Sequence, residues 1–270
     1  MRILVVGDVV GKAGRDAVAA HLPGLCDRLG LDFVVVNGEN AAHGFGITDK
    51  ICAQLYDLGA DVITTGNHVW DQREIMNYID GDPRLLRPLN YPAGTPGRGA
   101  GVYDAKSGAK VMVVNPMCRL FMDPLDDPFA GTEAVLAGHR LGQNVQAIVV
   151  DLHGEATSEK QSLAHVLDGR VSAVVGTHTH VPTADHQVLP GGTAYVTDLG
   201  MTGDYDSVIG MKKQPASARF ATKLPQARLE PAEGEATLCA ALIVTDDRTG
   251  LATSIDAVRV GGRLKAALPE

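Results

Sequence analysis

Short runs of apolar, β-branched residues alternate with stretches of helical spacing through the N-terminal part of the chain. Each apolar run is bounded by glycine or polar residues, and these runs predict strands at 3–6, 33–36 and 62–65. The stretches between and after them predict helices at 15–29, 49–58 and about 72–78. Gly30 is expected to end the first helix, and Thr48 is an N-cap residue for the second. This repeated β-α-β order predicts a parallel sheet.

The pattern changes in the middle of the chain. Two apolar stretches flank Ser107-Gly108 and predict a β-hairpin that joins 102–105 to 110–114. Residues 116–130 are rich in proline and aspartate and are expected to form a surface excursion. Farther on, we predict helices at 132–141 and 158–167, and strands at 147–151, 173–175, 194–197, 238–245 and 253–260. Two packed β-sheets with helices outside would accommodate these elements, so we expect one α/β domain spanning residues 1–270.

Composition narrows the range of functions. Hydrophobic residues make up 45% of the chain and charged residues 21%, which indicates a folded domain. The net charge is −8 without a block of like charges, so nothing favours a long nucleic acid or an anionic membrane as partner. The first apolar run is interrupted by Asp8, and no run approaches the roughly 20 residues of a membrane helix. We therefore expect a cytoplasmic protein whose cysteines are reduced, namely Cys26, Cys52, Cys118 and Cys239.

Candidate metal ligands stand at the ends of one predicted strand after another. Because the carboxyl ends of parallel strands converge on one edge of a sheet, we expect these side chains to lie together. Carboxylate and amide oxygens with imidazole nitrogens suit iron, manganese or zinc. Their number exceeds what one ion needs and suits two ions that share a carboxylate. The candidates are Asp8, Glu39, Asn40, Asn67, His153, His178 and His180.

The charge of such a site points to phosphate chemistry. Two divalent ions with Asp8, Glu39 and a bridging hydroxide would leave about one positive charge, since asparagine and neutral histidine add none. A positive site attracts phosphate, and water bound to it ionises near neutral pH. His178 and His180 would present both rings to one side if their segment is extended. The pattern thus indicates a phosphoester hydrolase.

Several motifs resemble those of a known family. The segments GD, GNH, an isolated histidine after a strand, and GTHTH resemble the ordered motifs of calcineurin-like metallophosphoesterases. The wider segments NGENAAHG, TTGNHVWD, VDLHGEATSEK, GTHTHVPTAD and DSVIGM are similar to the YmdB-type branch, in order from residue 3 to about residue 211. This resemblance implies a four-layer sandwich of two mixed sheets flanked by helices. It also implies a phosphodiesterase for 2′,3′-cyclic nucleotides with two iron or manganese ions, zinc and magnesium being the alternatives.

The chain departs from the superfamily's common pattern at two places. The histidine that usually follows the first aspartate is replaced by Val10, and the usual bridging aspartate is Glu39, so that Asn40 can fill the vacancy. The acidic residue that commonly follows the GNH motif is absent, and Asp71 is our candidate partner for His68. At both places the chain resembles the YmdB-type branch.

The resemblance, applied position by position, implies a role for each ligand. One ion would be held by Asp8, Glu39, Asn40 and His180, and the other by Glu39, Asn67, His153 and His178. Metal-bound hydroxide would attack the phosphorus. His68 would protonate the departing alkoxide, because a sugar oxygen leaves poorly without a proton, and such acid catalysis contributes ~10²–10⁴ in rate.

Other features leave alternatives open. We interpret His21, His139, His165 and His186 as structural or surface residues, whereas His43 is either a neighbour of the ligands or merely solvated. The 204–211 loop shapes the substrate pocket, forms an oligomer contact, or is an ordinary loop. The expected partner is a small phosphodiester or nucleotide, and a homo-oligomer is compatible with the sequence. The alternative functions are a phosphomonoesterase, such as a nucleotidase or protein phosphatase, and a non-catalytic regulatory protein that binds metal or nucleotide.

Overall fold

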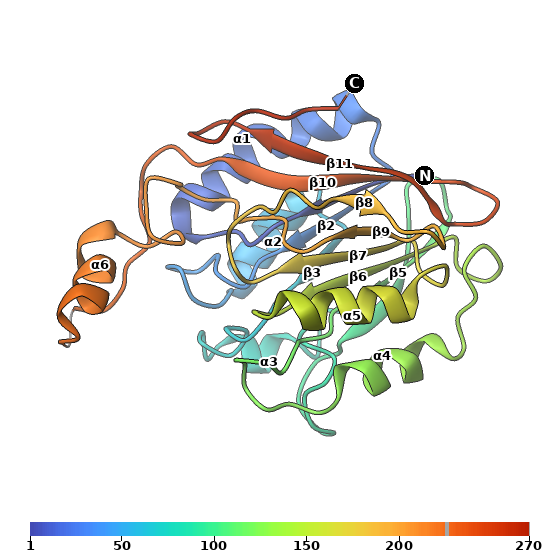
Figure 1. Cartoon of the computed structure of the whole chain (residues 1–270), viewed down its shortest axis with the longest axis horizontal. Helices are drawn as coiled ribbons and strands as arrows, with labels where there is room; N and C mark the ends of the chain where they lie inside the picture. Colours follow the sequence, from blue (N-terminus) through green and yellow to red (C-terminus); the bar gives the residue numbers. More distant parts are fainter. Residues whose placement is uncertain (225–226, 270) are drawn as a thin grey trace.

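The computed structural model describes residues 1–224 and 227–269, which form two β-sheets packed face to face (Figure 1). The first sheet has five strands in the order β11-β10-β1-β2-β3. Its parallel members are β1 (Arg2–Val6), β2 (Phe33–Asn37) and β3 (Val62–Thr64). β10 (Leu238–Thr245) pairs antiparallel with β1, and β11 (Ala252–Val260) pairs antiparallel with β10. The sheet is therefore mixed, with its β-α-β half at one side.

The second sheet has six strands in the order β4-β5-β6-β7-β9-β8. The parallel strands at its centre are β5 (Lys110–Val114), β6 (Ala147–His153), β7 (Ala173–Thr177) and β9 (Ala194–Val196). The antiparallel edge strands are β4 (Ala100–Asp104) and β8 (Gln187–Val188). β4 and β5 form the predicted hairpin.

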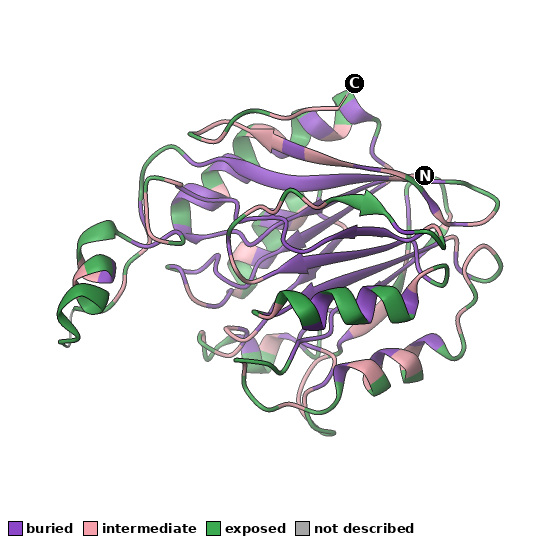
Figure 2. Ribbon diagram, in the orientation of Figure 1, coloured by how far each residue is buried: buried purple, intermediate pink, exposed green. Residues whose placement is uncertain are grey.

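Alternating side chains of the strands build the layers. In β1, Ile3 and Val5 belong to the apolar core between the sheets, while Leu4 and Val6 belong to a core on the outer face. Strands buried on both faces are apolar almost throughout, as the continuous runs in the sequence indicate. The helices on the outer face of the first sheet are α1 (Gly11–Leu29) and α2 (Asp49–Asp57), and those of the second are α4 (Pro128–Leu136) and α5 (Thr157–Leu167). The predicted two-sheet α/β sandwich with flanking helices is confirmed (Figure 2).

Local signals account for several helix ends. Gly30 closes α1 with φ of 58°, a left-handed conformation that glycine adopts without steric cost, and its N–H donates to Cys26 and Asp27 carbonyls. Thr48 caps α2 by accepting a hydrogen bond from the Ile51 N–H. Both ends agree with the sequence prediction.

Several predictions differ from the structure in their bounds or in their exposure. The helix expected at 132–141 is α4, which begins earlier because Asp127 caps it and Pro128 occupies its first turn. The helix expected at 72–78 is reduced to the single turn α3 (Ile75–Tyr78). The 116–130 excursion is exposed only in part, since Met117 and Cys118 are buried where the chain pairs with β6.

Two further elements were not predicted. The short β8 is one, and the other is α6 (Lys213–Thr222), which projects from the body of the molecule with Ala216 as its buried residue (Figure 1). His139 also lies outside the helix expected to hold it, in the loop after α4. Within the part of the chain described, no helix is long and apolar enough to cross a membrane.

Candidate metal centre

Two groups of side chains are arranged as metal ligands. Glu39, His153 and His178 form one group, and each offers a ligand atom within 4.8 Å of the others. Asp8, Glu39 and His180 form the second group by the same measure. Glu39 belongs to both groups, as a ligand that bridges two ions would.

The ends of strands from both sheets bring these residues together. Asp8 follows β1, Glu39 follows β2, and His153 is the last residue of β6. His178 comes directly after β7, so ligands from one sheet meet ligands from the other. Gly66 permits this approach, because a Cβ atom there would lie 2.1 Å from Glu39 Oε2 and 2.2 Å from His153 Nε2.

Two oxygens at this centre fit a cation. Asp8 Oδ1 and Asn40 Oδ1 are buried and have no hydrogen-bond partner among the described residues. The amide of Asn40 is oriented by its Nδ2, which donates to the Gly44 carbonyl at 3.0 Å and leaves Oδ1 as the atom without a partner. A buried acceptor without a donor is costly, and a metal ion satisfies it. The donor set therefore suits a divalent metal.

A buried chain of hydrogen bonds orients His153. Its Nδ1 lies 3.0 Å from Thr177 Oγ1, which donates to Asp151 Oδ1 at 2.7 Å. The other nitrogen, Nε2, is left to face Glu39 Oε1 at 3.2 Å and Asn67 Oδ1 at 3.1 Å. Partners of this kind fix the tautomer and the ring orientation of a ligating histidine. Asp151 is not among the ligands predicted from the sequence, although its spacing of two from His153 on a strand indicates a shared face.

The segment with His178 and His180 is not extended, so the condition for presenting both rings to one side is not met. Both residues have positive φ, 103° for His178 and 66° for His180, and residues other than glycine rarely adopt such values. The turn sends the two rings to different ligand groups. His180 Nδ1 lies 2.8 Å from the Ile209 carbonyl, which leaves Nε2 for a metal. The 204–211 loop thus contacts the site directly, a role that the sequence left open.

Burial and neighbouring charges shift the acid–base properties of the group. Burial raises the pKa of Asp8 to about 6, although His180 and His153 oppose the rise. Burial likewise favours a higher pKa for Glu39, but the charge and hydrogen bond of His153 outweigh it and lower the pKa to about 2. Burial and the nearby His153 lower the pKa of His178 to about 3. His178 is therefore neutral at physiological pH, the form that ligates metals.

His68 lies beside the ligand groups and belongs to neither of them. Its Nδ1 is 2.9 Å from Asp71 Oδ2, the partner that the sequence suggested, and its ring packs edge-to-face on Phe45. The backbone N–H of His68 donates to Glu39 Oε2 at 3.4 Å. The side chain keeps 29% of its surface exposed, so the ring is accessible to a substrate. His43 is exposed and likewise stands outside both groups found in the described chain.

Comparison with known proteins places the chain in a family. The family model described as "YmdB-like protein" matches residues 4–258. The chain belongs to the YmdB-like family. The resemblance drawn from the motifs is thereby confirmed. This YmdB-like chain is 48% identical over 260 residues to a Bacillus subtilis protein named 2′,3′-cyclic-nucleotide 2′-phosphodiesterase, covering 96% of the chain and 97% of the relative. It is 34% identical to a putative phosphatase/phosphodiesterase of Mycoplasma genitalium, over 82% of the chain and 80% of the relative.

Solved structures agree with this assignment. A hypothetical protein from Thermus thermophilus superposes on the YmdB-like chain with a TM-score of 0.90 at 43% identity, covering 97% of this chain and all of that one. A structure described as a novel phosphatase, from Mycoplasma pneumoniae, superposes with a TM-score of 0.88 at 32% identity, covering 97% and 93%. The fold is therefore that of the family over nearly its whole length.

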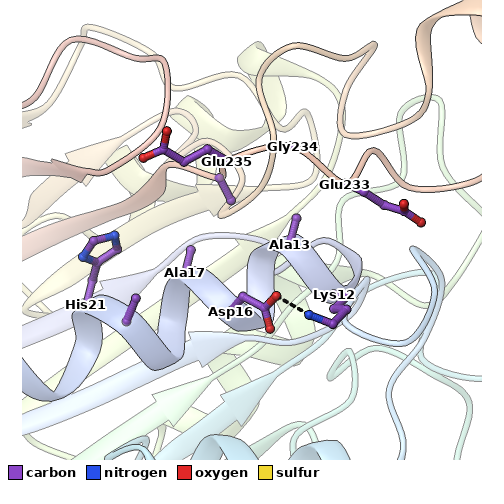
Figure 3. A pocket seen from close by; sticks show the side chains of 10 residues that line it. Lys12, Ala13, Asp16, Ala17, His21, Glu233, Gly234 and Glu235 are labelled. Atoms are coloured by element: carbon purple, nitrogen blue, oxygen red, sulfur yellow. Dashed lines mark hydrogen bonds and ion pairs between the residues drawn. The ribbon is translucent and has the colours of Figure 1, made fainter.

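A separate surface cavity of about 680 Å³ lies between α1 and the 233–236 segment (Figure 3). Its polar lining includes the exposed Lys12–Asp16 ion pair, His21 and two glutamates. It contains none of the candidate ligands of this YmdB-like chain, so the metal centre at the strand ends remains the candidate for chemistry.

Proposed function

We propose that this chain is a dinuclear metal-dependent phosphodiesterase that hydrolyses cyclic nucleotides, with 2′,3′-cyclic nucleotides such as 2′,3′-cAMP as the favoured class. Membership of the YmdB-like family and the name of the Bacillus subtilis relative support phosphodiesterase activity. The observation that carries the dinuclear proposal is that Glu39 belongs to both ligand groups. The substrate class rests on the likeness to that relative.

In this proposal each ion has four protein ligands. The first ion takes Asp8, Glu39, Asn40 and His180, and the second takes Glu39, Asn67, His153 and His178. When bound, the two ions would polarise the phosphate oxygens and lower the pKa of the attacking water. The resemblance to the YmdB-type branch favours iron or manganese, while the mixture of imidazole and carboxylate ligands also suits zinc.

His68 is the proposed proton donor. Because Asp71 engages Nδ1 at 2.9 Å, Nε2 is the nitrogen available to the substrate. The protonated ring would pass its Nε2 proton to the sugar oxygen as the P–O bond breaks. Asp71 would hold the ring in this orientation. A site that only binds metal or nucleotide has no need of this donor, which favours catalysis over a regulatory role.

Hydrolysis of a nucleotide panel tests the proposal. With Mn²⁺ or Fe²⁺ supplied, we expect turnover of 2′,3′-cAMP to exceed that of the 3′,5′-cyclic isomer and of nucleoside monophosphates. Bis-p-nitrophenyl phosphate should likewise be a better substrate than the p-nitrophenyl monoester. Preference for the monoesters would instead identify a phosphomonoesterase. Tight binding of metal and nucleotide without turnover would identify a regulatory protein.

A further inference from the structure

A fully buried ion pair lies behind the metal centre. Lys160 Nζ on α5 is 3.1 Å from Asp198 Oδ2, in the loop after β9, and both side chains have no exposed surface. Taking two charges out of water is expensive, and a packed apolar pair often stabilises a fold equally well. Stability alone therefore does not explain why two charges are buried here.

The pair holds the backbone on both sides of His178. Lys160 Nζ donates to the Thr177 carbonyl at 2.7 Å, immediately before the histidine. Asp198 Oδ2 accepts the N–H of Thr179 at 3.0 Å, immediately after it. Asp198 Oδ1 also accepts the N–H of Gly200 at 2.9 Å, which fixes the carboxylate within its own loop. Both peptide groups that flank His178 are thus fixed by charged partners.

These hydrogen bonds flank an unfavourable backbone conformation at His178. His178 has φ of 103°, outside the regions that residues with a Cβ atom normally occupy, and such strain persists only where the surroundings impose it. In this conformation the ring stands with Nδ1 3.1 Å from His153 Nε2. The His178 N–H also reaches Asp8 Oδ2 at 3.2 Å, so a shift of the peptide would disturb both ligand groups.

We propose that the Lys160–Asp198 ion pair is a positioning device that holds His178 in its ligating conformation. The inference rests on the proposed metal site, because His178 needs a set orientation only if it binds an ion. Neither Lys160 nor Asp198 belongs to a ligand group in the part of the chain that the structure describes. They act through the peptide groups and do not touch substrate or metal.

Three variants test this role: Lys160→Met, Asp198→Asn, and the double variant. Each single variant leaves one buried charge without its partner and should lose both melting temperature and Mn²⁺ affinity. The double variant removes both charges, so its melting temperature should recover toward that of the native chain. Its Mn²⁺ affinity, measured by titration calorimetry, should stay reduced by ~10–100-fold, the usual effect of losing a partner behind the ligands. Lys50→Met, at an exposed lysine of α2, is the matched control and should change neither property.

The measurements separate positioning from a purely structural role. A double variant that recovers Mn²⁺ affinity together with melting temperature would overturn the proposal. So would a Lys160→Met variant with native affinity. Failure of the proposed function has a different signature, since the native chain itself would then bind no Mn²⁺ or hydrolyse no phosphodiester.

Discussion

Replacement of His68 by alanine separates catalysis from metal binding. The ring belongs to neither ligand group within the described chain, so His68→Ala should keep its metal content. Loss of the acid should lower kcat by ~10²–10⁴ for 2′,3′-cAMP, whose departing sugar oxygen is strongly basic. The loss should be much smaller for bis-p-nitrophenyl phosphate, because p-nitrophenolate is stable without a proton.

The structure also sets the expected size of the Asp71 effect. The His68–Asp71 pair has a short contact of 2.9 Å, but the side chains keep 29% and 44% of their surface exposed. Pairs this accessible to solvent are worth about 0.2–1 kcal/mol. This free energy corresponds to about 1.4- to 5-fold in rate. Asp71→Asn should therefore show the same dependence on the leaving group as His68→Ala, at a far smaller magnitude.

Steady-state kinetics with 2′,3′-cAMP and bis-p-nitrophenyl phosphate, together with metal analysis of each preparation, test whether His68 donates the proton. His165→Ala, at an exposed histidine of α5, is the control and should match the native chain. Metal loss in His68→Ala with equal decreases for both substrates would mean that His68 is a ligand. Equal decreases with full metal content would refute proton donation and indicate that the ring stabilises phosphate charge.

Three other expectations follow from the ligand groups. Elemental analysis should find two transition-metal ions per chain, and the His178→Ala/His180→Ala double variant should lose most of both; full activity with one ion would exclude a dinuclear centre. Glu39→Ala should abolish activity more completely than Asn40→Ala, since Glu39 stands in both ligand groups; equal, mild losses in kinetic assays would rule out a bridge. Because the pKa of metal-free Asp8 is about 6, a proton competes with the ion below that pH, so Mn²⁺ affinity should fall as the solution is acidified. Calorimetry in buffers of different ionisation enthalpy should then detect proton release, and pH-independent binding would contradict the assignment of Asp8 as ligand.

Much of the sheet framework could be predicted from the chain. Strands such as β1 and β2 are buried on both faces, so their apolar side chains form continuous runs that are visible without any tertiary contact. Gly30 and Thr48 end and begin helices through interactions with their own neighbours along the chain. The candidate ligands were found for a related reason, because polar residues at the ends of parallel strands must gather at one edge.

Predictions failed where a local signal was overlooked or absent. The start of α4 depends on Asp127 and Pro128, a cap that the helical spacing alone does not reveal. The turn at His178 and His180 could not be predicted, because positive φ is uncommon for residues other than glycine and nothing in the local sequence imposes it. Contacts with Asp8, Asp198 and Ile209 accompany that conformation, all from distant parts of the chain.

The residues that orient the candidate ligands also could not be predicted, because only the tertiary structure brings them together from distant parts of the chain. Thr177 and Asp151 meet His153 only because β6 and β7 pair in one particular register. Lys160 reaches Asp198 only because α5 packs on the outer face of that sheet. Candidate metal ligands can be recognised in the sequence by their residue type and by their position at a strand end. The groups that orient these ligands cannot be recognised in the sequence. Ordinary threonines, lysines and carbonyls acquire that role through packing between elements far apart in sequence.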